Sequence, residues 1–363
     1  MRSRLHGALG ALALLTLAGC GGEYYQGPVS PHFDGERFHL PGDPRETGFL
    51  DFVRWRLEGG GPDWPERVEN RHADTPPARV EGEALRVSFV NHATVLIQTG
   101  GLNILTDPIW SERASPVSWA GPKRVRDPGV AFDALPKIDV VLISHNHYDH
   151  LDIPTIERVW RRDQPLILTP LGNDAILRDG IDGIEATAMD WGRTVAIGGG
   201  LSATLEPMRH WSRRGLSDTN KALWGAFVVH GPGGPIYFMA DTGYGDGSIF
   251  RAAAEKHGPF RFALFPIGAY KPEWFMSYAH MTPRDAVRAH LDSRACRSIA
   301  TQHLTFDLAD EGYDEPIRDL EAAKAELGLP AGAFLALENG QAVSVPPLIA
   351  GPDGRPACAP FGP

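Results

Sequence analysis

The sequence predicts an α/β fold in which short strands alternate with helices. Runs of β-branched and aromatic residues recur along the chain, and one of them is followed by a polar loop, a helix that starts at Pro154, and another strand. That order is typical of layered α/β domains. The 41 glycines and 31 prolines supply many turns. With 363 residues, 42% of them hydrophobic, the chain is long enough for one large domain or two smaller ones with a full core.

The N-terminus is predicted to be an export signal. Arg2 and Arg4 precede an apolar segment, 8–18, that is shorter than a membrane span, and small residues then lead to Cys20. The string 17–20, Leu-Ala-Gly-Cys, resembles a bacterial lipobox. The resemblance implies that residues 1–19 are removed as a lipoprotein signal peptide and that Cys20 is acylated with more than one chain, which holds a protein stably to a membrane. A plain export signal with a chance cysteine is the alternative.

The charge balance argues against nucleic acid as a partner. The formal net charge is −10, and removing Arg2 and Arg4 with the signal makes it −12, whereas phosphate-backbone binding needs a basic face. Cys296 and Cys358 would be the cysteines left after lipidation. An exported compartment permits a disulfide between them, but their spacing does not establish one. The sequence has no Cys-x-x-Cys, so metal ligands must be histidines and carboxylates.

Composition divides the chain after the signal into three parts. Residues 20–80 are rich in proline, glycine and charge, and they predict a tether and covering segment whose only helical piece carries Phe49, Phe52 and Trp55, expected to dock on the core. Residues 81–345 carry the strand-rich domain. Residues 346–363 form a proline- and glycine-rich tail that we expect to be disordered.

Within residues 81–345 the apolar runs predict the elements in order. The expected strands are 85–90, 95–98, 103–106, 138–143, 166–169, 184–189, 194–197, 201–206, 227–229, 236–240, 262–267, 299–301 and 336–344, and the expected helices are 154–161, 283–290 and 317–327.

The loop after the strand 138–143 predicts a metal site. It reads Ser144-His145-Asn146-His147-Tyr148-Asp149-His150, and imidazole and carboxylate are ligands of zinc, iron and manganese. In a tight loop His145 and His147 can face one metal while Asp149 and His150 face a neighbour. The pattern therefore predicts two metal ions.

With Asn146, Tyr148 and Leu151-Asp152, this loop resembles the signature of the metallo-β-lactamase fold hydrolases, in the form of their N-acyl-phosphatidylethanolamine phospholipase D-like branch. The resemblance implies an αββα sandwich of two central mixed β-sheets flanked by helices. It also implies that His210, at the end of another strand, completes the first metal site.

Other polar residues at strand ends are assigned by chemistry and by the same resemblance. Asp241 is predicted to bridge the two metals, because a carboxylate has two oxygens that can face two ions. Asp107 is expected to orient the metal loop from outside the ligand set, with a simple Asp-Pro turn as the alternative. His92 lies in a strand-to-strand turn, and we predict a polar turn residue beside the centre rather than a ligand.

The last ligand is the point where the sequence departs from the family. The usual family form places histidine two residues after an alanine and follows it with Trp-Gly-Thr-Phe or similar, which puts Gln302 in the ligand position and His303 one place later. A shift of one residue turns a side chain to the opposite face of a strand. We predict that a local bulge brings His303 to the second metal. The alternative is a second metal with one ligand fewer.

The expected activity is that of a binuclear zinc hydrolase with two Zn²⁺ per chain, although other divalent ions suit the same ligands. A metal-bridged hydroxide is the predicted nucleophile, with Asp149 orienting it and His280 contacting the phosphate or leaving group. The resemblance implies phospholipase D-type cleavage of an N-acyl-phosphatidylethanolamine-like phospholipid. Whether the aromatic group 274–278 lines a lipid channel or packs in the core is left open.

Two other functions and the location complete these expectations. An envelope lactonase or esterase with the same fold is the first alternative, and a non-catalytic zinc-binding lipoprotein is the second. The lipidated Cys20 predicts a bacterial envelope protein, with the periplasmic face of the outer membrane favoured. Self-association is left open.

Overall fold

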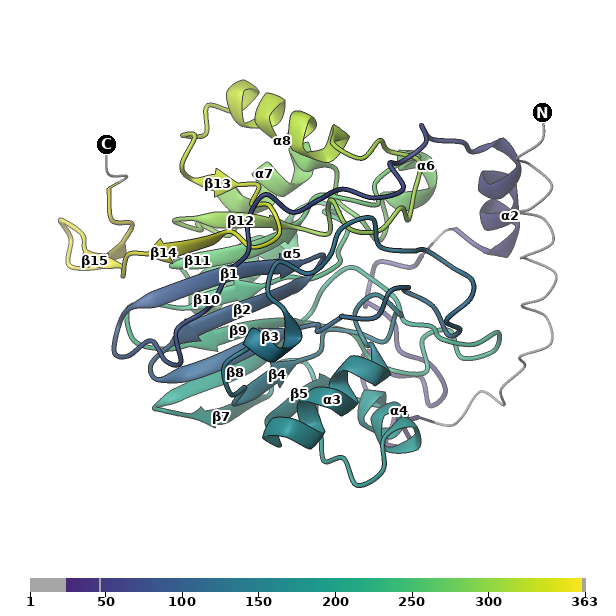
Figure 1. Ribbon diagram of the computed structural model, residues 1–363, viewed down its shortest axis with the longest axis horizontal. Helices are drawn as coiled ribbons and strands as arrows, with labels where there is room; N and C mark the ends of the chain where they lie inside the picture. The colour runs from purple at the N-terminus through teal and green to yellow at the C-terminus, as the bar shows by residue number, and fades with distance from the viewer. Residues whose placement is uncertain (1–23, 46, 361–363) are drawn as a thin grey trace.

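The protein is built from two facing β-sheets with helices on their outer sides, as the computed structural model of residues 24–45 and 47–360 shows (Figure 1). Each sheet has seven strands, in the orders β14-β1-β2-β3-β4-β5-β6 and β13-β12-β11-β10-β9-β8-β7. Both sheets contain parallel and antiparallel pairs. The predicted sandwich of two mixed sheets flanked by helices is therefore confirmed.

The strands of the first sheet are β1 (Leu85–Asn91), β2 (Thr94–Thr99), β3 (Leu102–Thr106), β4 (Val140–Leu142), β5 (Leu166–Pro170), β6 (Thr187–Met189) and β14 (Ala342–Val345). Those of the second are β7 (Thr194–Gly198), β8 (Leu201–Glu206), β9 (Ala226–His230), β10 (Ile236–Phe238), β11 (Phe262–Pro266), β12 (Ser298–Thr301) and β13 (Phe334–Leu335).

The helices cover the outer faces of the two sheets. In Figure 1, α3 and α4 lie at the bottom of the molecule, while α7 and α8 lie at the top. Side chains of α3 and α4, including Ile156 and Leu177, share a buried cluster with Val141 and Ile167 of the first sheet. The described helices are α2 (Phe49–Glu58), η2 (Phe132–Ala134), α3 (Ile153–Asp163), α4 (Asn173–Gly180), α5 (Ser248–His257), α6 (Glu273–Met276), α7 (Pro283–Asp292) and α8 (Glu315–Glu326).

The main core lies between the sheets. Phe89 and Val87 of β1 and Phe227 and Phe238 of the opposite sheet are buried in one apolar cluster. Most strands are buried on both faces, because the facing sheet covers one side and helices cover the other. This explains why the strand runs in the sequence are nearly continuous in hydrophobic residues.

Parallel pairing brings the polar strand ends together. β3 and β4 run in parallel with Thr106 opposite Leu142, so the residues that follow them are neighbours. In the second sheet β10, β11 and β12 are also parallel, with Phe238 opposite Leu264 and Leu264 opposite Ile299. Ligand-binding residues in α/β sheets gather at the carboxyl ends of such strands.

The covering segment docks on the core by aromatic side chains. Trp55 of α2 is 7% exposed and stacks on Phe275 of α6, with ring centroids 5.2 Å apart. Phe52 is 43% exposed, so it reaches this cluster only in part. Farther upstream Phe33 and Phe38 are buried in the main core. In Figure 1, α2 lies beside α6 at the edge of the molecule opposite β15 (Ile349–Ala350).

The C-terminal segment differs from the prediction in two ways. The expected strand 336–344 is two separate strands, because β13 ends at Leu335 in the second sheet and β14 begins at Ala342 in the first. The expected disorder of the tail is wrong for residues 346–360. There β15 pairs with β16 (Pro356–Ala357), and a disulfide joins Cys296 to Cys358.

Among residues 24–45 and 47–360, no helix has the length and apolar character needed to cross a membrane. Cys20 and the predicted signal peptide 1–19 lie outside the described residues.

Candidate metal centre

The histidine loop follows β4 and folds as a tight turn before α3. The carbonyl of His147 accepts hydrogen bonds from the N–H groups of His150 and Leu151, at 3.1 and 2.9 Å. The next helix begins at Ile153, with Pro154 in its first turn, where a missing N–H costs no helical hydrogen bond. The turn therefore brings the three histidines together, with the His145 ring 4.2 Å from that of His150 and 4.6 Å from that of His147.

Asp107 holds this loop in place from the end of β3. One of its oxygens accepts the N–H of Ser144 at 2.8 Å, and the other accepts the Ser144 hydroxyl at 2.6 Å and Nδ1 of His150 at 2.7 Å. Asp107 and His150 are both fully buried. This is the orienting role that the sequence predicts for Asp107.

His145, His147 and His210 converge on one point. Nε2 of His145 lies 2.9 Å from Nδ1 of His147, which lies 3.2 Å from Nε2 of His210. Nδ1 of His210 faces the carbonyl of Ala279 at 3.1 Å, and Nδ1 of His145 faces the Ser144 hydroxyl at 2.9 Å. These outer acceptors hold the ring protons on Nδ1, which leaves the two Nε2 lone pairs turned toward the common point.

A second group lies beside the first and contains more carboxylate. Nε2 of His150 is 3.3 Å from Oδ2 of Asp149 and 3.2 Å from Oδ2 of Asp241. His92 approaches from the turn between β1 and β2, and its Nε2 lies 2.9 Å from Oδ2 of Asp149. The ligand atoms of His92, Asp149 and His150 all lie within 4.8 Å of one another.

Asp241 lies against the second group, with Oδ2 3.2 Å from Nε2 of His150, and it is near enough to His210 for each to shift the pKa of the other. It follows β10, and the neighbouring Thr242 hydroxyl accepts the N–H of Arg209 at 2.9 Å, which ties the Asp241 loop to the residue before His210. Asp241 is 2% exposed, and its Oδ1 has no hydrogen-bond partner among the described residues.

The two groups differ in electrostatics. Burial, strengthened by the neighbouring imidazoles, lowers the pKa of His145 and His210 well below the ordinary value, and burial lowers the pKa of His147 to about 4. Burial also opposes protonation of His150, but the carboxylates of Asp241 and Asp149 outweigh it and raise the His150 pKa well above its ordinary value. Burial would raise the pKa of Asp149, but His150 and His92 hold it well below the ordinary range.

These residues fit divalent metal ions. Nε2 of His150 and Oδ1 of Asp241 are buried without a hydrogen-bond partner in the described part of the chain, an expensive arrangement unless something else satisfies them. Neutral imidazoles and carboxylates are the donors that zinc and related ions take. The chemistry of the donor set and its unsatisfied atoms therefore agree with two adjacent ions.

The predicted ligand His303 does not face this centre. Its Nε2 lies 3.0 Å from the carbonyl of Leu337, and its ring stacks on Phe89 at 5.0 Å. Gln302 faces the centre instead, with Nε2 2.6 Å from Oδ2 of Asp241. The predicted bulge is absent: Gln302 takes a left-handed conformation, φ 58°, directly after β12, and the next side chain turns into the core. The assignment of His303 as a ligand is therefore wrong in this structure.

Three other residues at the histidine loop hold its conformation through hydrogen bonds. Asn146 accepts the N–H of Arg213 at 2.8 Å, and Tyr148 donates to the carbonyl of Arg214 at 3.1 Å. Asp152 accepts the Ser111 hydroxyl at 2.8 Å. Their contacts tie the loop to neighbouring segments and do not by themselves select a substrate.

His280 closes one side of the centre. Its Nδ1 is 3.8 Å from Oδ2 of Asp241 and has no hydrogen-bond partner among the described residues, and its side chain is 14% exposed. Burial lowers the pKa of His280 and favours the neutral ring. The site that the sequence predicts for contact with substrate is therefore next to the metal ligands and open to one side.

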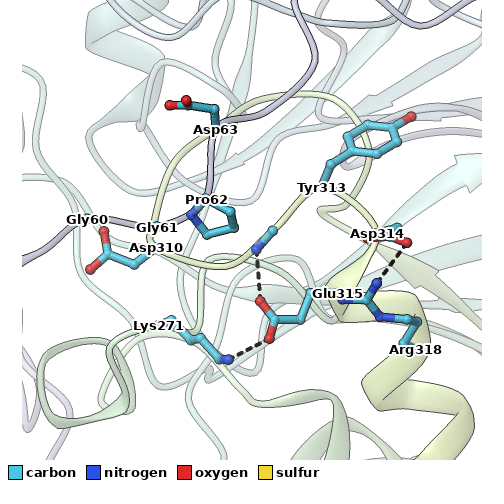
Figure 2. Close-up of a pocket in the computed structure, with 11 residues that line it drawn as sticks. Gly60, Gly61, Pro62, Asp63, Lys271, Asp310, Tyr313, Asp314, Glu315 and Arg318 are labelled. Atoms are coloured by element: carbon cyan, nitrogen blue, oxygen red, sulfur yellow. Dashed lines mark hydrogen bonds and ion pairs between the residues drawn. The ribbon is translucent and has the colours of Figure 1, made fainter. Parts of the chain in front are cut away.

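A pocket of about 490 Å³ lies elsewhere, between the covering segment at 60–63 and the loop before α8 (Figure 2). None of the metal-centre residues lines it. Four of its charged groups form two ion pairs, Lys271 with Glu315 at 2.7 Å and Arg318 with Asp314 at 3.0 Å. We interpret it as a polar seam where the covering segment meets the core.

Comparison with known proteins agrees with this geometry. A model of the β-lactamase superfamily domain matches residues 102–303. N-acyl-phosphatidylethanolamine-hydrolyzing phospholipase D 1 of Caenorhabditis elegans is 37% identical over 269 residues, which cover 71% of this chain and 75% of the worm protein. The chain belongs to the metallo-β-lactamase superfamily. It is a metallo-hydrolase of the N-acyl-phosphatidylethanolamine phospholipase D-like branch, as its loop predicts.

Relatives of this superfamily occur widely. An uncharacterised protein of Mycobacterium tuberculosis is 40% identical over 309 residues, covering 81% of this chain and 80% of the relative. Among solved structures, a possible metal-dependent hydrolase from Veillonella parvula superposes with a TM-score of 0.57 at 14% identity, over 72% of this chain and 99% of that one. A metallo hydrolase from Ignicoccus hospitalis gives 0.52 at 20% identity, over 72% and 98%. These structures support the fold alone.

Proposed function

We propose that this protein is a binuclear zinc-dependent phosphodiesterase that cleaves N-acyl-phosphatidylethanolamine-like phospholipids in the manner of phospholipase D. The observation that carries the proposal is the pair of adjacent ligand groups with Asp241 beside them, in a chain 37% identical to a phospholipase D with that substrate in its name. The reaction adds water across the phosphodiester. The hydroxyl goes to phosphorus to give phosphatidic acid, and the proton goes to the oxygen of the released N-acylethanolamine.

His145, His147 and His210 would hold one ion, Asp149 and His150 the other, and Asp241 would lie between them. When bound, two such ions lower the pKa of an attacking water and neutralise charge that develops on the phosphoryl oxygens. The protein supplies the arrangement of these donors and a buried surrounding in which electrostatic interactions are strong.

Asp149 and His280 act on the reacting groups. Asp149 is kept ionised, so its free lone pairs can accept a hydrogen bond from water and orient it. His280 has a neutral ring with an unpaired Nδ1 and a partly open side, and it is placed to hydrogen-bond a phosphate oxygen or the leaving oxygen.

Arg45 favours an anionic substrate. Its guanidinium lies over Trp211, 4.2 Å from the ring centre, and the Trp211 ring lies 4.6 Å from that of His147. Burial lowers the pKa of Arg45, with a further contribution from Arg213, and its hydrogen bond is to the neutral Thr47 hydroxyl. A cation near the metals that is bonded to a neutral group suits a phosphodiester better than an uncharged lactone.

The neighbouring surface supports a lipid substrate. On α2, Leu50 and Leu57 are 80% and 81% exposed, and on the adjoining α6 Trp274 is 44% exposed. α6 lies four residues before His280 in the sequence, so this apolar group is close along the chain to the open side of the centre. Phe275 and Met276 of the same helix are buried, so the aromatic group 274–278 is partly core and partly surface. Lipidation of Cys20, in a bacterial envelope, remains part of the proposal.

The test uses the purified protein beginning after Cys20. We expect about two zinc ions per chain, metal-dependent cleavage of bis(p-nitrophenyl) phosphate, and release of N-acylethanolamine from liposomes that contain N-acyl-phosphatidylethanolamine. A lactone and ester panel is assayed beside the liposomes. Turnover of lactones or esters with no lipid cleavage would favour the envelope lactonase or esterase, and metal binding without any turnover would favour the non-catalytic lipoprotein.

A further inference from the structure

The second metal group lacks the histidine that the family form places at position 302. Gln302 occupies that place, and its amide nitrogen faces Oδ2 of Asp241 at 2.6 Å while its Oε1 has no hydrogen-bond partner among the described residues. The amide nitrogen has no lone pair for a metal, and the amide oxygen is a neutral oxygen donor in place of the imidazole of the family form. The second group therefore has Asp149, His150 and the shared Asp241 but no second imidazole, unless another residue supplies one.

His92 is a histidine already in position. Its ring is 1% exposed, its Nε2 lies 2.9 Å from Oδ2 of Asp149, and its ring centre lies 5.3 Å from that of His150. Its ligand nitrogen belongs to the same compact group as those of Asp149 and His150, all within 4.8 Å. His92 therefore offers the second group an imidazole nitrogen, which Gln302 does not.

The backbone fixes His92 there. His92 has a left-handed conformation, φ 47°, which is uncommon for a residue with a side chain. Its N–H donates to the Thr305 hydroxyl at 3.1 Å, and its carbonyl accepts the N–H of Gln302 at 2.9 Å. The turn after β1 and the turn after β12 are therefore bonded to each other, so one holds a histidine beside the second group while the other holds a glutamine.

We propose that His92 is the histidine ligand of the second metal, together with Asp149, His150 and Asp241, and that Gln302 positions Asp241 by hydrogen bonding. The inference rests on the proposed metal-dependent function but not on its phospholipid substrate. It replaces the predicted ligand His303 with a residue from the opposite sheet. Each metal position would then have three ligands of its own plus the shared Asp241, and a place open to substrate and water.

The experiment compares His92→Gln, His92→Ala, Gln302→Ala and His303→Ala in the protein beginning after Cys20. Each variant is loaded with zinc, titrated against a chelator, and analysed for metal per chain, and folding is followed by circular dichroism. His92→Gln retains a side-chain N–H for Asp149 but removes the imidazole. Loss of a hydrogen-bonding neighbour typically weakens metal binding about 10–100-fold, so a direct ligand should cost more.

We expect about two zinc ions in the wild type, Gln302→Ala and His303→Ala, and about one in both His92 variants, with the second metal bound more than ~100-fold more weakly. Cobalt(II) substitution gives a second readout, because the absorption of the second ion reports loss of a nitrogen ligand. In His92→Ala with Gln302→His, the histidine at 302 should restore the second ion, since that side chain faces Asp241.

Two ions with unchanged chelator release in His92→Gln would overturn the inference, as would loss of the second ion in Gln302→Ala but not in His92→Gln. If His92→Ala does not fold, His92→Gln decides the result. A wild type with well under one ion would overturn the metal-dependent function itself, whereas a failure to cleave phospholipid would leave these stoichiometries unchanged. The two failures are therefore distinguishable.

Discussion

The two ligand groups of the candidate metal centre differ in charge. The group of His145, His147 and His210 is made of imidazoles whose pKa values are lowered, mainly by burial, so it is neutral and its nitrogens are free. The group around His150 contains Asp149 and Asp241, and the pKa of His150 is raised. Without metal the first group is a set of neutral imidazoles in contact with one another, and the second is an ion-paired cluster. The first is thus ready for a cation, while the second must release a proton to accept one.

The largest expected effect is at the first group. His145→Ala should remove the first ion and reduce hydrolysis of bis(p-nitrophenyl) phosphate by more than the roughly 100-fold that changes outside the ligand set produce, because one of three converging nitrogens is lost. Metal content and kcat/KM measure it. The matched control is His303→Ala, another buried histidine, whose metal content should not change. Equal metal loss in both variants would contradict the placement of His303.

Asp107→Asn should affect both groups, with the larger effect at the second. Asp107 binds His150 directly but reaches His145 only through Ser144. Metal affinity should fall about 10–100-fold, measured by chelator competition. Asp139→Asn, just before β4, is the control, since Asp139 pairs with Arg79 and not with a ligand. A larger loss at the first position than at the second would reverse the expected order.

Arg45→Ala tests whether the phosphate binds beside the first ligand group, where the Trp211 ring packs against both Arg45 and His147. We expect kcat/KM for the phosphodiester to fall about 10-fold, equal to roughly 1.4 kcal/mol, mainly through KM, with no change for an uncharged lactone. Arg161→Ala is the control, because Arg161 on α3 pairs with Glu157. An equal fall for both substrates would argue against a phosphate contact.

A separate effect, outside metal binding and catalysis, is on the stability of the metal-free protein. The pKa of His147 is about 4 in the fold but near 6.5 when unfolded, so the unfolded chain binds more protons and stability falls as the pH drops below 6.5. His147→Gln should lessen that fall by roughly 2 kcal/mol between pH 6.5 and 5, as urea unfolding at several pH values would show. The exposed His72→Gln should leave the slope as it is. For His150 the sign is opposite: its raised pKa contributes stability that is lost as the pH rises through that value.

Much of the fold and the centre follows from local sequence, because buried strands are apolar runs and ligands stand at their ends. The loop 144–150 and Asp241 were found this way, whereas His210 was assigned from the family resemblance. Helices α4 and α5 were not, since both are short and each begins after a left-handed glycine, Gly172 and Gly247. The sequence also did not predict that the chain passes from the second sheet to the first at residues 336–341.

The misplacement of His303 has a local physical cause. Gln302, the residue before it, has a left-handed backbone, as His92 does, and a single such residue turns the next side chains to unexpected faces. Periodicity cannot show where a non-glycine residue adopts this conformation, because the surroundings that hold it come from distant segments. For His92 the sequence allowed two interpretations, because a histidine in a turn between two buried strands is either a polar turn residue or a ligand.

The covering segment has a consequence for how the molecule can be divided. Asp43 forms an ion pair with Arg209, the neighbour of His210, and the hydroxyl of Tyr278 donates to the Asp43 carbonyl at 3.2 Å. The family match spans 102–303, and the strand-rich domain was predicted to begin at 81, yet both boundaries cut away residues that border the candidate metal-binding histidines. The family domain is therefore shorter than the segment that must be expressed to keep the candidate site intact. A truncation at 81 would expose one side of that site to solvent.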